Sequence, residues 1–491
     1  MQNLTPKGNP LCTNSGGGNT SRPLVFDLDG TLTASDLFLE QFLALAHNKP
    51  FVAALSLGRN FTRPERAKMV IARQAPPLDL AELPWRQEVL ALLAAARAQG
   101  RPVILATAAD RSVAEAVSAH LGGFDDILAS DESINLKGPE KAAALVRRYG
   151  RKGFDYVGDS PADLAVWEAA NTAWVVAPGR SLLASAQRVG TPLQTLGTAP
   201  APGRYLQMLR PRHWLKNLIL FVPLLAGHRL PETPEAIRLI FLFAAFCALA
   251  SATYLFNDLL DLHDDRVHPK KRHRPLASGR ISPWVALRLC GILVALAFSA
   301  GAMAGVLPLA WLAAYAVLGF LYCLYLKRWP GLDLIALAGF YLIRLEAGSA
   351  AVSILITPWL ISFALAGFLT LALAKRASEL RLRATAGDGG SRRRFYRTHH
   401  LQIINGVGVS MGFAACGILA AYAWSPGATL LYDKPHFLGI VAALFAIGNV
   451  RFWIRNSASG QGDDPLQGFL HDPVLLILAA LSLGLAVYSS H

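Results

Sequence analysis

Long apolar stretches fill the second half of this 491-residue chain, and they restrict its fold more than any other feature. Several approach the roughly twenty residues that a helix needs to cross a hydrocarbon core of about 30 Å. Hydrophobic residues make up 53% of the chain and charged residues only 16%, which is too apolar for one soluble globule. We therefore expect an all-α membrane domain over residues 206–491 with about nine transmembrane helices. The stretches lie near 214–228, 236–257, 284–305, 307–326, 332–351, 355–374, 401–424, 436–453 and 473–489.

The first part of the chain has the pattern of a soluble α/β domain. Short apolar strands alternate with helical patterns, and this alternation predicts a parallel sheet. The expected strands are 24–26, 102–106 and 154–157, and the expected helices lie within 36–99, 110–121 and 139–149. We expect a disordered lead-in over 1–21, the α/β domain over 22–180, a Pro-, Gly-, Ser- and Ala-rich linker over 181–205, and then the membrane domain.

The net charge of +14 follows from membrane topology rather than from nucleic-acid binding. If the soluble domain is cytoplasmic, the inner loops hold most of the loop lysines and arginines, whereas the outer loops hold only Arg229 and Lys434. This bias is typical of proteins that follow the positive-inside rule. It predicts a multi-pass protein of a bacterial inner membrane with a cytoplasmic N-terminal domain and no nucleic-acid partner. Lys270, Arg280 and the run Arg392–Arg394 are interpreted as topology anchors.

Carboxylates follow two of the predicted strands. Asp27 and Asp29 come directly after the first strand, at the sheet edge where open α/β folds bind ligands. Asp27 can attack phosphorus as a nucleophile, and Asp29 can protonate the leaving oxygen. Thr107 ends the second strand and can donate its hydroxyl to a phosphate oxygen. Asp159 and Asp163 follow a later strand, and with Asp27 and Asp29 they can form a Mg²⁺ site.

A lysine at such a site would neutralise charge on a transferring phosphoryl group. Lys137 and Lys141 both precede the later strand, and the sequence leaves the choice between them open. The ordered set of aspartates, threonine and lysine resembles the haloacid dehalogenase superfamily of phosphatases. The resemblance implies a Mg²⁺-dependent phosphomonoesterase with a small helical cap between Thr33 and Trp85. The alternative is a domain that senses phosphometabolites without turnover.

Several polar residues end the second apolar stretch. Asp258, Asp261 and Asp265 have the spacing i, i+3 and i+7, which places them on one face of a helix, and Asn257 lies beside them. Charges at membrane depth are costly, so clustered carboxylates there usually face a polar cavity. The pattern resembles the UbiA family of intramembrane prenyltransferases. By that resemblance, these four residues bind a diphosphate through Mg²⁺.

The second acidic motif of prenyl-diphosphate users is changed in this chain. After the sixth stretch the sequence is Lys375-Arg376-Ala-Ser-Glu379, which suits an additional phosphate group better than a second metal ion. This and the flanking motifs are similar to decaprenyl-phosphate phosphoribosyltransferases, which implies 5-phosphoribosyl diphosphate as donor and a polyprenyl phosphate as acceptor. The expected substrate-binding residues are Lys216, Lys271, Arg272, Arg274, Lys327, Asp333, Lys375, Arg376 and Glu379.

The two halves suggest one reaction sequence. A product that carries 5-phosphoribose on a lipid phosphate keeps a phosphomonoester, and the soluble domain could remove it to give a precursor of envelope ribose or arabinose donors. The rival hypothesis is a prenyltransferase that moves a polyprenyl chain from its diphosphate to an aromatic acceptor. Whether the protein forms a homo-oligomer is left open by the sequence.

Overall fold

The computed structural model describes residues 22–60, 64–131, 135–268, 270–385, 397–458 and 465–490. It contains two compact units, one built mainly from residues up to 201 and the other mainly from residue 202 onward. The lead-in expected over 1–21 and the run Arg392–Arg394 lie outside the described residues.

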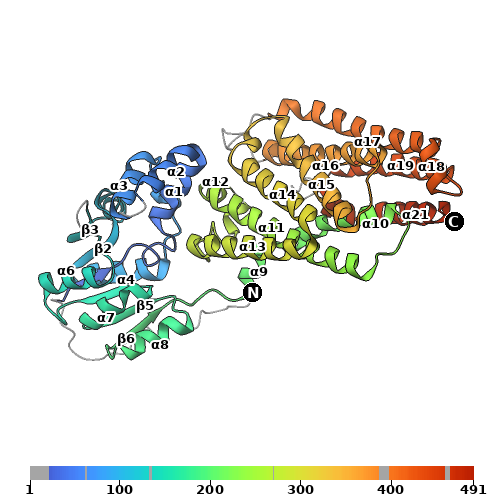
Figure 1. Cartoon of the computed structure of the whole chain (residues 1–491). Coiled ribbons are helices and arrows are strands. Elements are labelled where there is room, and N and C mark those ends of the chain that lie inside the picture. Colours follow the sequence, from blue (N-terminus) through green and yellow to red (C-terminus); the bar gives the residue numbers. More distant parts are fainter. Residues whose placement is uncertain are drawn as a thin grey trace, which may run out of the picture. The chain divides into compact units, whose positions relative to one another are not determined.

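The first unit is a doubly wound α/β domain. Its six strands are all parallel and lie in the order β3-β2-β1-β4-β5-β6, so β1 has β2 on one side and β4 on the other (Figure 1). The strand order reverses at β1, where such sheets form a crevice at their carboxyl edge. The strands are β1 (Leu24–Phe26), β2 (Val103–Asp110), β3 (Asp126–Ser130), β4 (Asp155–Gly158), β5 (Ala173–Val176) and β6 (Leu193–Leu196).

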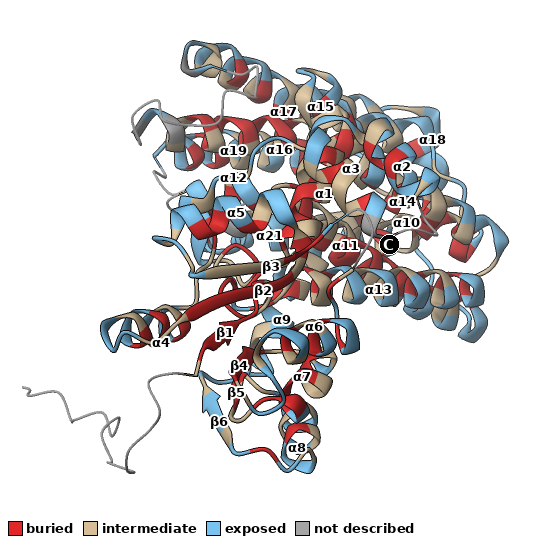
Figure 2. Ribbon diagram, turned by 90° about the vertical axis from the view of Figure 1, so that its left-hand side faces the viewer, coloured by how far each residue is buried: buried red, intermediate tan, exposed pale blue. Residues whose placement is uncertain are grey.

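Helices cover both faces of this sheet, and alternate strand residues contact opposite layers. Phe26 packs with α4 (Gln87–Ala98) and α5 (Arg111–His120), whereas Val25 packs with α6 (Pro139–Tyr149) and α7 (Leu164–Ala169). Figure 2 shows β1, β2 and β4 as buried for this reason. The α/β parallel-sheet fold predicted from the sequence is confirmed.

Three helices form the small cap that was expected between Thr33 and Trp85. They are α1 (Leu37–Asn48), α2 (Pro50–Arg59) and α3 (Pro64–Gln74), and they share a small core that includes Leu45 and Ile71. An antiparallel bridge between Thr33 and Trp85 brings the two connections of the cap together. The cap therefore enters and leaves the α/β domain at one place.

The linker predicted over 181–205 differs from the structure, in which most of this stretch is part of the α/β domain. Residues up to 196 belong to the α/β domain, because α8 (Arg180–Arg188) is followed by β6, which pairs with β5 in a parallel register from Ala173↔Leu193 to Val176↔Leu196. The Ser- and Ala-rich composition of this stretch is compatible with a short helix and a four-residue edge strand.

The second unit is all helical, as predicted. Within the described ranges, seven helices are long and apolar enough to cross a membrane, and α21 is a shorter apolar helix. The seven are α11 (Thr233–Leu260), α13 (Pro283–Ala304), α14 (Val306–Leu324), α15 (Leu332–Val352), α16 (Pro358–Thr385), α17 (Leu401–Ala423) and α19 (Phe437–Ala458). The shorter segments are α9 (Gly203–Leu209), α10 (Val222–Ala226), α12 (Leu262–Val267), α18 (Pro426–Leu431), α20 (Pro465–Leu470) and α21 (Pro473–Ser489).

The first of the nine expected helices differs in form. Residues Pro211–Phe221 make the 3-10 segment η3, and α10 follows it for only five residues. Pro223 is the second residue of α10 and has no N–H to continue an α-helical ladder from η3. Close packing fixes this segment, because a Cβ atom on Gly348 of α15 would lie 2.1 Å from the carbonyl oxygen of Leu220.

Candidate active sites

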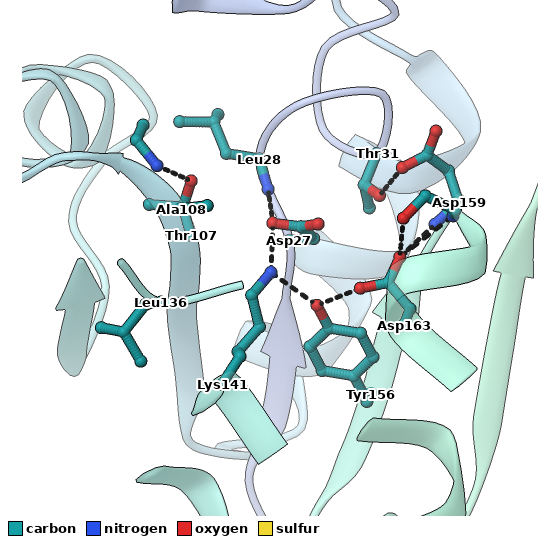
Figure 3. Close-up of polar contacts among 12 residues, drawn as sticks. Asp27, Leu28, Thr31, Thr107, Ala108, Leu136, Lys141, Tyr156, Asp159 and Asp163 are labelled. Atoms are coloured by element: carbon teal, nitrogen blue, oxygen red, sulfur yellow. Dashed lines mark hydrogen bonds and ion pairs between the residues drawn. The ribbon is translucent and has the colours of Figure 1, made fainter. Parts of the chain in front are cut away.

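The carboxyl end of β1 places Asp27 at the centre of the first site. The backbone N–H of Asp27 donates to the carbonyl of Val157 on β4, and its carboxylate accepts a hydrogen bond from the N–H of Leu28 at 2.8 Å. Lys141 of α6 lies 2.8 Å from the same carboxylate, and both side chains are almost fully buried (Figure 3). A buried ion pair of this kind holds the nucleophile candidate in one orientation.

A chain of hydrogen bonds links Lys141 to the next carboxylate. The ammonium group of Lys141 donates to the hydroxyl of Tyr156 at 2.9 Å, and that hydroxyl donates to Asp163 at 2.9 Å (Figure 3). Burial alone would lower the pKa of Lys141, but the carboxylates of Asp27 and Asp163 outweigh it and raise the pKa. The lysine is therefore a permanent cation in this site.

Three carboxylates converge beside this lysine. Carboxylate oxygens of Asp27, Asp159 and Asp163 lie within 4.8 Å of one another, a set that suits the hard-oxygen preference of Mg²⁺. Burial, reinforced by the neighbouring carboxylates, raises the pKa of Asp159 to about 8, and burial raises that of Asp27 to about 6. The cost of ionising these groups together indicates a site that is completed by a cation.

Asp29 lies apart from the three convergent carboxylates. Its side chain accepts a hydrogen bond from the N–H of Leu37 at 2.8 Å, where the cap begins. Burial and the nearby Asp36 hold the pKa of Asp29 well above its usual range, so this carboxyl group keeps a proton that it can donate. Gly30, with φ of +78°, makes the turn between Asp29 and Thr31, and its Cα lies against Asp159.

The other sequence candidates of the first site differ in position. Thr107 is fully buried, and its hydroxyl accepts from the N–H of Ala109 at 3.0 Å. It lies inside β2 rather than at its end, because β2 continues with a shifted register to Asp110. Lys137 precedes α6 and is exposed, whereas Lys141 is buried against Asp27.

Two cationic groups of this site were not predicted. Lys68 of α3 donates to the carbonyl of Ala108 at 2.8 Å, and the carboxyl groups of Asp29 and Asp36 lie close enough to act on its charge. Arg86 donates to the carbonyl of Gly30 at 2.9 Å. Neither residue belongs to a sequence motif with a regular spacing, so the sequence alone does not identify Lys68 or Arg86 as part of the site.

The second site begins at the cytoplasm-facing end predicted for α11. This helix ends at Leu260, and Asp261 separates it from α12. The N–H groups of Asp261 and Asp265 still donate to the carbonyls of Asn257 and Asp261, at 2.9 and 2.8 Å. The helical spacing that the sequence predicted for the aspartates therefore persists across the one-residue break.

Each of these aspartates contacts a cation from another segment. Arg210 lies 2.5 Å from Asp258, Lys327 lies 2.6 Å from Asp261, and Lys271 lies 3.7 Å from Asp265. Asn257 joins the same network, because its amide donates to Asp261 at 2.9 Å and accepts from Lys327 at 3.1 Å. Lys271 is thus one of the predicted substrate-binding residues that lie at the acidic motif, whereas the side chain of Arg272 is exposed and that of Arg274 is half-buried.

The basic second motif contains a paired arginine and a separate lysine. Arg376 is buried and contacts Asp333 at 2.6 Å, Glu379 at 2.6 Å and the hydroxyl of Tyr322 at 3.0 Å. Lys375 is half-buried, and among the described residues no carboxylate lies within salt-bridge distance of its ammonium group. Lys216 in η3 is half-buried. Of the two adjacent cations, Lys375 is therefore the better candidate to meet a substrate anion.

A buried arginine lies deeper in the second unit. Arg344 of α15 is 4% exposed and donates to Asn217 at 2.7 Å, to the carbonyl of Phe340 at 2.7 Å and to the hydroxyl of Tyr315 at 2.9 Å. None of these hydrogen bonds goes to Glu346, which lies two residues along the same helix. Through these hydrogen bonds, Arg344 of α15 links η3 and α14.

Both units match the models of known protein families. Residues 218–471, more than half of the chain, match the model of the UbiA prenyltransferase family. The chain belongs to the UbiA prenyltransferase family. Residues 24–168 match the haloacid dehalogenase-like hydrolases, so a hydrolase-like domain precedes the UbiA domain in one polypeptide.

Some relatives are similar to this chain over nearly its whole length, and others over about a third of it. The protein y4nM of Sinorhizobium fredii is 32% identical over 462 residues, which cover 94% of this chain and 89% of that protein, so the similarity includes both the hydrolase-like and the UbiA domains. Decaprenyl-phosphate phosphoribosyltransferase of Mycolicibacterium smegmatis is 35% identical over 158 residues, or 30% of this chain and 47% of that enzyme. The nodulation protein NoeC of Azorhizobium caulinodans is 39% identical over 147 residues, which are 30% of this chain and 48% of that protein.

A change of Tyr156 to phenylalanine tests the hydrogen-bond chain of the hydrolase-like domain. Loss of the hydroxyl leaves both Lys141 and Asp163 one partner short, so we expect hydrolysis of p-nitrophenyl phosphate to fall about tenfold, with about 1–2 kcal/mol lost in stability. Tyr149→Phe is the matched control, because that hydroxyl bonds Asp126, outside the site. Equal rates for the two variants would contradict the role of Tyr156.

The raised carboxyl pKa values predict a pH-dependent response to Mg²⁺. The pKa of Asp159 moves from 3.8 to about 8 on folding, so the metal-free domain binds protons more tightly than the unfolded chain. Asp159 therefore stabilises the metal-free domain most below about pH 4, and this contribution is lost as the pH rises through about 8. Mg²⁺ should raise the melting temperature of the UbiA protein in detergent more at pH 8 than at pH 5.5. A Mg²⁺ response that is independent of pH, or that persists in Asp159→Asn, would contradict this expectation.

Proposed function

We propose that the protein transfers 5-phosphoribose from 5-phosphoribosyl diphosphate to a polyprenyl phosphate, and that its hydrolase-like domain then removes the 5-phosphate. The observation that carries the first half is the basic second motif, in which Lys375 and Arg376 stand where prenyl-diphosphate users have carboxylates. The partial similarity to decaprenyl-phosphate phosphoribosyltransferases supports the same assignment.

The diphosphate of the donor would lie at the end of α11. Asp258, Asp261 and Asp265 provide carboxylates for Mg²⁺, and Lys271 and Lys327 lie beside them to contact diphosphate oxygens. In both domains, bound Mg²⁺ would supply positive charge that orients phosphate oxygens and stabilises a leaving group or an attacked phosphorus. The bond from C1 of ribose to the diphosphate oxygen breaks, and an oxygen of the lipid phosphate forms the new bond to C1.

Two lysines are suited to bind a phosphate group other than the diphosphate of the donor. Lys375 has no carboxylate within salt-bridge distance among the described residues, and Lys216 lies in segment η3 of the same domain. A half-buried lysine is a strong point charge for a phosphate group. We assign Lys375 and Lys216 to the 5-phosphate of the donor or to the phosphate of the lipid. Arg376 would instead position Glu379 and Asp333, to which it is already bound.

The hydrolase-like domain would act on the phosphomonoester that the transfer leaves behind. An oxygen of Asp27 forms a bond to phosphorus while the bond to the ribose 5-oxygen breaks, and Asp29 gives its proton to that oxygen. Lys141 and Thr107 would hold phosphoryl oxygens during the transfer. Water then cleaves the aspartyl phosphate, with Asp29 as base, and inorganic phosphate leaves. The convergence of Asp27, Lys141 and Asp163 supports catalysis over phosphate sensing.

The proposal is tested with purified protein, Mg²⁺, 5-phosphoribosyl diphosphate and a polyprenyl phosphate. Mass spectrometry of the lipid fraction should find polyprenyl-phosphoryl-ribose, with its 5-phosphorylated form as a transient intermediate. A product seen only with polyprenyl diphosphate and an aromatic acceptor would instead establish the rival prenyl transfer. A 5-phosphorylated lipid that is never hydrolysed would refute the role of the hydrolase-like domain.

A further inference from the structure

Arg210 has a strained backbone between α9 and η3, near the start of the membrane domain. Its φ and ψ are 52° and 57°, in the left-handed region that residues other than glycine enter at a cost of about 1 kcal/mol. The next residue is Pro211, which also disfavours a helical conformation before it. Strain of this kind persists only where the surrounding contacts require it, and it is concentrated at functional sites.

Contacts with α11 hold this strained turn in place. The hydroxyl of Ser251 donates to the carbonyl of Leu209 at 2.7 Å and accepts from the indole N–H of Trp214 at 3.0 Å. The guanidinium group of Arg210 lies over the ring of Tyr254, 5.2 Å from its centre. These anchors lie one and two turns before Asp258 on the same helix, and they direct Arg210 along α11.

This turn places the guanidinium group of Arg210 against the carboxylate of Asp258. One nitrogen of Arg210 lies 2.7 and 2.5 Å from the two carboxylate oxygens, and the side chains are 21% and 11% exposed. Lys327 contacts Asp261 and Lys271 contacts Asp265, so each aspartate of the motif has a cation in contact with its carboxylate. These cations offset the negative charge of the carboxylates, which weakens their attraction for a bare divalent ion.

We infer that Arg210 is a diphosphate-binding residue that blocks Asp258 until the donor arrives. A free divalent cation must displace a charged, hydrogen-bonded arginine and gains no compensating contact. A metal-bound diphosphate brings its own negative oxygens, so Arg210 exchanges one anionic partner for another. The metal site of the membrane domain therefore forms only together with the donor. This inference rests on the proposed metal-diphosphate site, but not on which group the diphosphate carries.

Binding of Mn²⁺ alone, followed by electron paramagnetic resonance of the full-length protein in detergent, tests the inference. All proteins carry D159N and D163N, which remove the metal site of the hydrolase-like domain. We expect R210Q to bind Mn²⁺ at least about tenfold more tightly than the parent, with KM for the donor raised about tenfold and D258N abolishing the gain. R210K keeps the charge and should bind Mn²⁺ within about twofold of the parent.

The matched control is R229Q, which breaks the ion pair between Arg229 and Glu235 at the other end of the same helix. It should leave Mn²⁺ binding unchanged. S251A releases the anchored turn and should raise Mn²⁺ affinity in the same direction as R210Q, which provides a second test if R210Q does not fold. Unchanged or weaker Mn²⁺ binding in the folded variants would overturn the inference. A gain in Mn²⁺ affinity with no binding of 5-phosphoribosyl diphosphate would support the inference and refute the proposed donor.

Discussion

Asp27→Asn is expected to stop the reaction sequence at the 5-phosphorylated lipid. An amide in place of this carboxylate cannot form the aspartyl phosphate, so hydrolysis of a phosphomonoester should fall by roughly 10³-fold or more. The transfer in the membrane domain uses other residues, so the phosphorylated lipid should accumulate while diphosphate release continues. Thin-layer or mass-spectrometric analysis of the lipid products measures both forms.

Asp126→Asn provides the control for this experiment. Asp126 lies on β3 of the same sheet and pairs with Arg148 and Tyr149, outside the group of convergent carboxylates. It should leave the product distribution unchanged. If the Asp27→Asn protein still yields the dephosphorylated lipid in a purified system, the hydrolase-like domain does not act on the product of its own chain.

Asp261→Asn should have the opposite effect on the two activities. The carboxylate of Asp261 is joined to Asn257 and Lys327, so its loss removes a metal ligand and leaves the Lys327 cation without its carboxylate contact. We expect diphosphate release to fall by about 10²–10³-fold, whereas hydrolysis of p-nitrophenyl phosphate stays within about twofold.

Glu235→Gln is the matched control, because Glu235 lies at the far end of the same helix and pairs with Arg229. Diphosphate release by this variant should stay close to that of the unmodified protein. An Asp261→Asn protein that transfers at the normal rate would show that the acidic motif does not hold the donor. Loss of both activities would indicate misfolding, which the p-nitrophenyl phosphate assay is chosen to detect.

The positions of the phosphatase motifs could be predicted because each follows a strand. Asp27 comes directly after the apolar residues of β1, and Asp159 directly after β4, and neighbouring parallel strands bring such residues to one edge. The choice between Lys137 and Lys141 could not be made from spacing alone. It depends on the start of α6 at Pro139, which leaves Lys137 outside the helix and turns Lys141 toward Asp27.

Three strands were missed because their local signals are weak. β3 begins with an aspartate, β5 has four residues, and β6 has two adjacent polar residues at its centre, inside a stretch rich in Ser, Ala and Gly. Their pairing with the central strands stabilises them, and a window of sequence does not contain that information. The boundary of the soluble domain was therefore set too early.

The acidic motif of the membrane domain was predicted, but its partners were not. Helical spacing identifies which aspartates share a face, yet Arg210 is 48 residues from Asp258, and Lys327 is 66 residues from Asp261. Arg376 was predicted to contact a substrate phosphate, but its contact with Asp333, 43 residues away, was not predicted. Such contacts depend on how helices pack, which periodicity does not determine.

Release of diphosphate from competing donors tests the central proposal most directly. The purified protein receives Mg²⁺, a polyprenyl phosphate and either 5-phosphoribosyl diphosphate or a polyprenyl diphosphate with an aromatic acceptor. The account predicts lipid-dependent diphosphate release from 5-phosphoribosyl diphosphate, lost in Asp261→Asn and retained in Glu235→Gln. Release from the polyprenyl diphosphate alone, with 5-phosphoribosyl diphosphate left intact, would contradict it.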